Sequence, residues 1–191
     1  MRTFRTLTTA ALSLLVAACG DSTYAWREQV LLQEGQQVLV ERTARFRENW
    51  VAGGGGGSFN KGMTLRVIHG PMPMPQSTWD ERFVPIVLER DLGNGEWVVI
   101  ATFFHCDSWY ELGRPSLPYV EFRHREGGWT RQALNPQWIG HPANVLAVDP
   151  SEKQAMSGRE TLTVERKRTI VETSTMAPEY RRVVDHWSTG C

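Results

Sequence analysis

The chain has 191 residues, and its 21 basic and 21 acidic side chains cancel at neutral pH. Such a balance gives no positive field for a phosphate backbone, so the composition argues against a nucleic-acid-binding protein. No stretch reaches the length of about 20 apolar residues that a transmembrane helix needs, so a polytopic membrane protein is also excluded.

The first 18 residues have the pattern of a secretory signal peptide. Arg2 and Arg5 make the start basic, and residues 7–18 form an uncharged run that ends in small residues. A basic start, an apolar run and small residues before a cleavage point are the three parts of such a signal. Residues 1–18 are therefore expected to be removed on export.

The residues around the expected cleavage point are Val16-Ala17-Ala18-Cys19. They resemble the lipobox of bacterial lipoproteins, in which the cysteine receives a diacylglycerol and, after cleavage, an acyl chain such as palmitate on its amino group. The resemblance implies that Cys19 is lipidated and that acyl chains hold the mature protein to a membrane. By the rule known for enteric lipoproteins, Gly20 in place of an aspartate favours the outer membrane. The expected location is thus the periplasm-facing envelope of a Gram-negative bacterium.

After cleavage, residues 19–25 are expected to form a lipidated tether, and residues 26–191 a single β-rich globular domain. Six extended residues reach roughly 20 Å, so the domain should lie close to the bilayer. Residues 1–18 carry two arginines and no acid, which leaves the mature chain with a formal net charge of −2. This small charge gives no reason to expect binding to acidic lipids.

Two further cysteines, Cys106 and Cys191, are predicted to form a disulfide. Thiols of exported domains tend to pair because the compartment is oxidising. The bond would close a loop of about 86 residues and contribute at most about 4.6 kcal/mol by chain entropy. A reactive Cys106 thiol is the alternative, since His105 and Asp107 flank it. On a strand, however, alternate side chains face opposite ways, and both neighbours would point away from the sulfur.

Residues 26–134 are predicted to form antiparallel hairpins. The clearest joins 83–90 to 96–104 through Asn94-Gly95, a pair that readily adopts the positive φ angles of a tight turn. Turn-forming residues also separate the other strand pairs. The remaining elements are a hairpin of 26–32 with 37–47, a flexible glycine loop at 53–58, a short strand at 64–69, a Pro-Met loop at 71–75, and a hairpin of 119–125 with 129–134.

The last third of the chain is predicted to be more varied. Residues 135–158 are expected to be irregular, with a helical turn at 151–156. Alternation through Leu162 and Val164 predicts an exposed or edge strand over 161–173. Apolar residues from Tyr180 to Trp187 recur at helical spacing after Pro178, which predicts a short C-terminal helix. The expected fold is mainly β, an antiparallel meander of roughly eight strands in a barrel-like or sandwich domain.

Residues 118–123, Pro-Tyr-Val-Glu-Phe-Arg, followed by Gly128-Trp129, are similar to a segment of small proteobacterial lipoproteins of unassigned function. The resemblance covers about a dozen residues and implies no activity.

The Pro-Met loop is one candidate site. Met72 and Met74, with Met63 and His69 nearby, carry the soft thioether and imidazole groups that copper binds. The alternative is a rigid loop whose methionines cover apolar surface. No pair of histidines has the spacing of a structural zinc site, so neither a metal nor a cofactor is predicted.

The eight tryptophans are a second candidate. Trp97 and Trp129 lie on expected strands and are assigned to the core. Trp79, Trp109 and Trp138 lie near turns, where an exposed group would stack on a glycan or a partner protein. The alternative, which is favoured, is that each fills an apolar corner.

No motif for catalysis stands out in the sequence. The expected function is therefore a non-enzymatic, lipid-anchored envelope protein whose domain binds another envelope protein, a glycan or a target that it inhibits. Two alternatives stay open: a copper-handling lipoprotein, and a hydrolase whose site is assembled by the fold.

Overall fold

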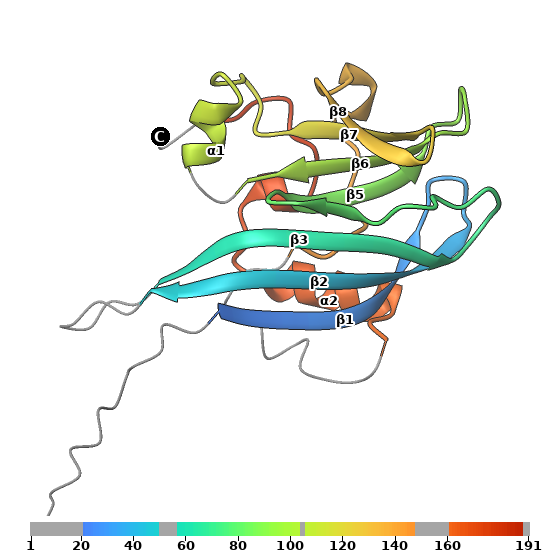
Figure 1. Cartoon of the computed structure of the whole chain (residues 1–191), viewed down its shortest axis with the longest axis horizontal. Coiled ribbons are helices and arrows are strands. Elements are labelled where there is room, and N and C mark those ends of the chain that lie inside the picture. The colour runs from blue at the N-terminus through green and yellow to red at the C-terminus, as the bar shows by residue number, and fades with distance from the viewer. Residues whose placement is uncertain (1–20, 50–56, 104–105, 148–160, 189–191) are drawn as a thin grey trace, which may run out of the picture.

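The structure is a computed structural model that describes residues 21–49, 57–103, 106–147 and 161–188. It contains two four-stranded antiparallel sheets, and within each sheet the strands follow the order of the chain. The expected mainly β, antiparallel meander is confirmed. Figure 1 shows one sheet above the other, with β3 of the first next to β5 of the second.

The first sheet consists of β1 (Asp21–Leu31), β2 (Gln37–Asn49), β3 (Gly57–His69) and β4 (Trp79–Glu81). Its residues alternate between a solvent-exposed face and a buried face, as expected for a sheet covered on one side. The buried face carries mostly apolar side chains, including Trp26, Val30, Val38, Val40, Phe46 and Leu65.

β1 begins earlier than the sequence predicts. Residues 21–25, part of the expected tether 19–25, pair with residues 43–47 of β2. Backbone pairing with the long β2 strand thus extends the domain to Asp21. Backbone pairing with β2 likewise extends β3 back to Gly57. Gly57 and Ser58 therefore belong to a strand and not to the expected glycine loop. The rest of that loop lies outside the described residues.

The second sheet consists of β5 (Val84–Arg90), β6 (Trp97–Thr102), β7 (Val120–Arg125) and β8 (Gly128–Gln132). Residues 84–89 of β5 and all of β6 are buried on both faces. Gly95 has a φ of +72° in the β5–β6 turn. Glycine adopts this angle without strain, which explains why Asn94-Gly95 predicted a tight turn here. Both predicted hairpins of this sheet are confirmed.

The two sheets share a single apolar core and do not close into a barrel. The arrangement is therefore the open, sandwich-like form of the expected fold. No strand occupies 71–75, in agreement with the predicted Pro-Met loop. The expected helical turn at 151–156 lies outside the described residues.

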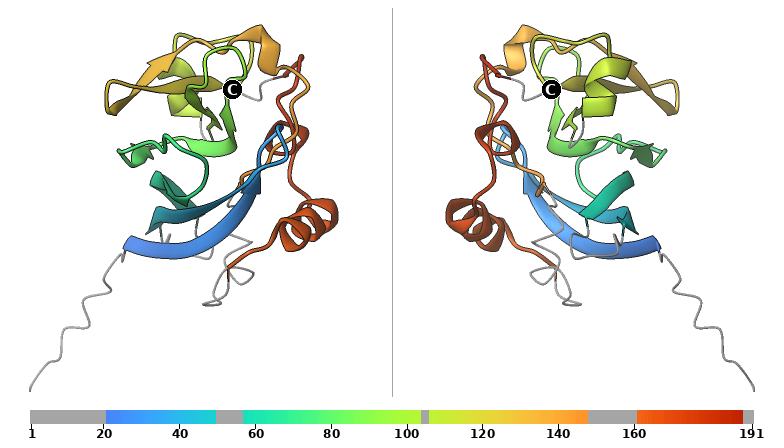
Figure 2. Two further views of the ribbon diagram at one scale, coloured as in Figure 1. Left: turned by 90° about the vertical axis from the view of Figure 1, so that its right-hand side faces the viewer. Right: turned by 90° about the vertical axis from the view of Figure 1, so that its left-hand side faces the viewer.

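The C-terminal helix is present, but at a different place. Residues 161–173, expected to be a strand, contain α2 (Val164–Thr173), whose first turn is capped by the Thr163 hydroxyl accepting from the Arg166 amide at 3.2 Å. Figure 2 shows α2 beside the first sheet.

The helix expected over 178–187 is reduced to a 3₁₀ turn, η3 (Pro178–Tyr180). Beyond it the chain is extended and pairs with residues 140–143. The Val183 amide donates to the His141 carbonyl at 2.9 Å, and the Gly140 amide donates to the Val183 carbonyl at 2.7 Å. These partners replace the bonds that a helix would have made.

Candidate functional site

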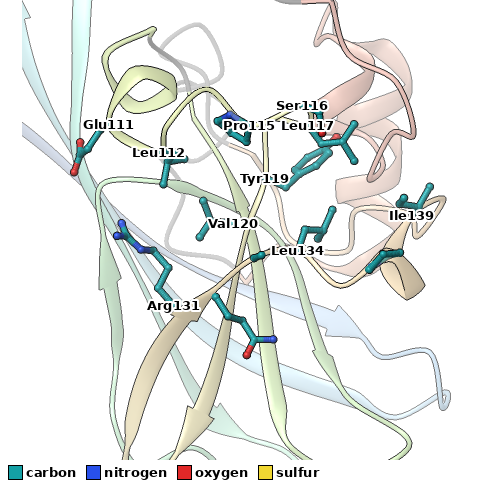
Figure 3. A pocket seen from close by; sticks show the side chains of 13 residues that line it. Glu111, Leu112, Pro115, Ser116, Leu117, Tyr119, Val120, Arg131, Leu134 and Ile139 are labelled. Carbon is teal, nitrogen blue, oxygen red and sulfur yellow. The ribbon is translucent and has the colours of Figure 1, made fainter.

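A groove of about 600 Å³ lies over one end of the second sheet. One wall is formed by the connection from α1 (Cys106–Glu111) to β7. The other wall is formed by the end of β8 and the 3₁₀ helix η1 (Pro136–Trp138). Figure 3 shows the lining side chains: Glu111, Leu112, Pro115, Ser116, Leu117, Tyr119, Val120, Arg131, Gln132, Ala133, Leu134, Pro136 and Ile139.

The first wall is held by a tight reversal after α1. Gly113 and Arg114 both have positive φ angles, of 77° and 61°, and the Arg114 amide donates to the Trp109 carbonyl at 2.9 Å. The Trp109 indole then donates to the Pro115 carbonyl at 3.1 Å. Pro115 to Pro118 thus run in a fixed path along the groove.

The second wall is tied to the sheet by Asn135. Its backbone N–H donates to the buried Glu121 carboxylate at 2.8 Å. Its side-chain oxygen accepts from the backbone N–H of Gln137 at 3.1 Å and so caps η1. This places Leu134 and Ile139 on either side of the cap. Ile139 is 40% exposed, which is high for an aliphatic side chain of this size.

The middle of the groove is aliphatic, and its single phenol is already engaged. The Tyr119 hydroxyl donates to the Arg182 carbonyl at 2.9 Å and accepts from the Val184 amide at 3.0 Å. Burial raises the pKa of Tyr119 to about 12. Its hydroxyl therefore fixes the C-terminal segment and stays protonated at neutral pH.

The charged groups lie at one end of the groove. Glu111 is paired with Arg82, and Arg131 lies near Glu81, whose pKa is raised by burial. In Figure 3, Glu111 and Arg131 stand at the end away from Ile139. The groove is thus an apolar channel with one charged end, a surface suited to binding.

A second polar group lies inside the core, away from the groove. Glu28 and Arg42 are both fully buried, with Oε1 and Nη1 2.7 Å apart. The other Glu28 oxygen lies 3.1 Å from Nζ of Lys167 and accepts from the Leu146 amide at 3.0 Å. Burial alone would raise the pKa of Glu28, but Lys167 and Arg42 hold it below its ordinary value.

A third group surrounds Glu89, which is also buried. Its carboxylate accepts from the Gln33 amide at 3.0 Å and from the Asn144 side chain at 2.9 Å. His141 Nε2 lies 3.4 Å from the same carboxylate. Burial alone would lower the pKa of His141, but hydrogen bonds with Glu89 and with the Pro142 carbonyl raise it.

The cysteines are only partly described. Cys106 opens α1 and is not on a strand, so the predicted strand geometry at this position is wrong. Its sulfur is engaged in a disulfide bond. Cys19 and Cys191 both lie outside the described residues, so the lipidation of Cys19 and the pairing of Cys106 with Cys191 stay predictions.

The methionines of the copper hypothesis lie in different surroundings. Met72 is 74% exposed, Met74 packs against the core, and Met63 is fully buried beside Arg42. His69 is exposed at the end of β3. Across the described ranges, no three His, Cys, Asp or Glu side chains come together as a metal site would require.

Trp79, Trp109 and Trp138 do not form an exposed group. Trp79 and Trp138 are buried, at 0% and 3% exposure, which confirms the apolar-corner interpretation for both. Trp109 is half-buried and donates to Pro115. Trp97 is buried as predicted, and Trp129 packs against the core while donating to the Ser77 carbonyl at 3.0 Å.

Sequence reasoning missed the groove and the buried ion pair. Arg42 occupies an inward position in the alternation Val38, Val40, Ala44, and Glu28 does so between Trp26 and Val30. A charged residue at an inward-facing position of a strand could therefore have indicated the buried ion pair. No sequence pattern indicates the groove, because its walls are mainly loops that only the fold brings together.

No family model, curated protein or solved structure matches this chain. In the described part of the chain, neither α1 nor α2 is long and apolar enough to cross a bilayer.

Proposed function

We propose that this chain is a lipoprotein of the bacterial envelope, anchored through Cys19, and that its groove binds an aliphatic segment of another envelope protein. The sequence around Cys19 supports the anchor. The groove between the α1–β7 connection and η1 carries the binding proposal, because it exposes aliphatic side chains in a preformed hollow.

The chemistry of the walls favours a protein partner over a glycan. Sugars are commonly recognised by stacking on open aromatic faces. Here the walls are mainly leucine, valine, isoleucine and proline, and the tryptophans among the described residues are buried or packed against the core. Aliphatic walls instead suit leucine-like or valine-like side chains, which bury apolar area without needing polar partners.

The position of the groove favours an extended segment. β8 contributes Arg131 and Gln132 to the lining and is the last strand of its sheet. A partner strand beside β8 would gain backbone hydrogen bonds while its side chains enter the groove. An acidic residue of the partner would complement Arg131 at the charged end.

The start of β1 bears on where such a partner lies. The first strand begins at Asp21, two positions after Cys19. With so few residues between lipid and domain, the anchored domain would lie against the membrane surface. The proposed partner is therefore a protein at that surface. Neither copper handling nor hydrolysis is favoured by a specific contact among the described residues.

Site-specific photo-crosslinking in intact cells tests the proposal. A photoreactive side chain is placed at Ile139 in the groove and, as a control, at Leu92, which is 67% exposed in the β5–β6 turn. We expect a discrete crosslinked protein from position 139 and not from position 92. A second substitution in the groove, Leu117→Asp, should remove that product. The same crosslinks from both positions, or none from position 139, would contradict the proposal.

A further inference from the structure

A second cavity, of about 360 Å³, lies between α2 and residues 142–146. It shares no lining residue with the groove. We propose that this cavity binds a single-chain amphiphile with a carboxylate head group. The proposal does not depend on the groove or on its partner.

The walls of the cavity would hold the acyl chain. Leu31 comes from the end of β1, Val145 and Leu146 from the segment after His141, and Val164 and Val171 from α2. Val145 and Leu146 are buried in the apolar core, so the cavity reaches inward from the surface. Aliphatic carbon placed here is removed from water, which favours binding in proportion to the apolar area buried.

The charges of the cavity favour an anion. Three cations line it, Lys167, Arg168 and Arg181, against one acid, Glu172. Arg168 is exposed at the rim, whereas Lys167 is only 6% exposed. A carboxylate is the group that arginine and lysine bind through charge-assisted hydrogen bonds.

The buried ion pair behind the cavity adds to this preference. Glu28 carries one negative charge and is shared between two cations, Arg42 and Lys167, all of them buried. The Asn144 carbonyl also accepts from Lys167 but carries no formal charge. Among the described residues, this cluster behind the cavity therefore has one more cation than acid in a poorly solvated place, where an incoming anion is stabilised and an incoming cation is repelled.

The size of the cavity limits the ligand. Pockets for small molecules span about 300–1,000 Å³, and this one is near the lower end. One acyl chain of medium length fits such a volume better than a two-chain phospholipid. A carboxylate at the rim with its chain pointing inward satisfies both the cations and the aliphatic walls.

Calorimetric titration of the full chain carrying Cys19→Ser, exported so that its disulfide forms, provides the test. Decanoate is compared with decanol and decyltrimethylammonium, which keep the chain and change the head group, and with acetate, which keeps only the head group. We expect decanoate to bind at least about tenfold more tightly than the other three, since the charge and the chain both contribute. Equal affinity for decanoate and decanol, or acetate binding as tightly as decanoate, would overturn the proposal.

Two substitutions locate the site. Arg168→Glu reverses an exposed rim charge and should weaken decanoate about tenfold while leaving decanol unchanged. Arg166→Glu, on the same helix but outside the cavity, is the matched control and should have no effect. Val171→Phe fills the cavity and should weaken both decanoate and decanol, with folding checked by circular dichroism. Equal effects of Arg168→Glu and Arg166→Glu, or decanoate binding unchanged by a folded Val171→Phe variant, would show that the ligand is elsewhere.

Discussion

Glu28 and Arg42 form an ion pair with a 2.7 Å separation in which both side chains are fully shielded from solvent. They lie on the buried faces of β1 and β2, and Nζ of Lys167 on α2 lies 3.1 Å from the other Glu28 oxygen. The guanidinium of Arg42 also lies 5.0 Å from the centre of the Trp26 ring. This group fixes how α2 sits on the first sheet, and α2 in turn forms one side of the second cavity.

Glu28→Gln should be strongly destabilising. The substitution leaves two buried cations without an acid, and breaking a buried pair on one side costs about 3–5 kcal/mol. The matched control is Glu41→Gln, since Glu41 also pairs with arginines, Arg27 and Arg66, but on the exposed face of the sheet. There the loss should stay below about 1 kcal/mol. Urea unfolding of both variants checks this; similar losses from the two would show that burial does not set the cost.

His141 should make the stability depend on pH near neutrality. Its raised pKa means that the folded protein holds the proton more tightly than the unfolded chain does. The stabilisation is therefore complete below the ordinary pKa of 6.5 and is lost as the pH rises through the raised pKa of the folded state. The free energy of unfolding of the wild type, taken relative to that of His141→Gln, should therefore fall between about pH 5 and pH 9. His186→Gln, at an exposed position, is the control for the replacement of a histidine by glutamine.

The hairpins of the second sheet were predictable because their signals are local. Asn94-Gly95 and Gly127-Gly128 lie at the turns, and Gly95 and Gly127 adopt φ angles of +72° and +82°. Strands on each side of such turns are rich in β-branched and aromatic residues. Nothing more distant than the next strand is needed to form them.

α2 was missed because its buried position holds a lysine. Val164, Lys167 and Val171 follow helical spacing and all line the second cavity, but the charge at position 167 breaks the apolar pattern. The remaining alternation of Leu162 and Val164 then imitated a strand. The Glu28 carboxylate and the Asn144 carbonyl, both distant in the sequence, make Lys167 acceptable inside.

The groove could not be predicted at all from local patterns. Leu117 lies in an irregular segment, and Ile139 follows a three-residue 3₁₀ turn. Their proximity depends on Asn135 reaching Glu121 and on the Trp109–Pro115 hydrogen bond. Both contacts fix loops, which carry no hydrophobic period.

Gly62→Ala should destabilise the first sheet. Gly62 has a φ of +150°, and an added Cβ would lie 2.4 Å from Nη2 of Arg45 and 3.3 Å from the Glu81 carbonyl oxygen. The expected loss is about 1–3 kcal/mol, from backbone strain and from displacement of Arg45. Gly128→Ala is the control, because a Cβ added there would have nothing within 4 Å. The midpoint of thermal unfolding should fall for Gly62→Ala and stay unchanged for Gly128→Ala. An unchanged midpoint for Gly62→Ala would contradict the expected backbone strain.

The predicted disulfide has its own support in the packing of the C-terminal segment. The rings of Phe103 and Trp187 meet edge to face at 5.7 Å, three residues before Cys106 and four before Cys191. We expect Cys191→Ser to lower the free energy of unfolding by about 2–4 kcal/mol. Exported protein carrying Cys19→Ser should show no free thiol before reduction. Two reactive thiols in that material would rule the bond out.

The membrane anchor is tested most directly by mass spectrometry of the N-terminal peptide from protein exported in its native membrane. We predict that the mature chain begins at Cys19 and that this residue carries a diacylglyceryl group and an N-linked acyl chain. Cys19→Ser should yield no acylated peptide, and the protein should be released from the membrane. A mature chain that begins at another residue, or an unmodified Cys19, would contradict the proposal that lipid holds this β-domain at the membrane.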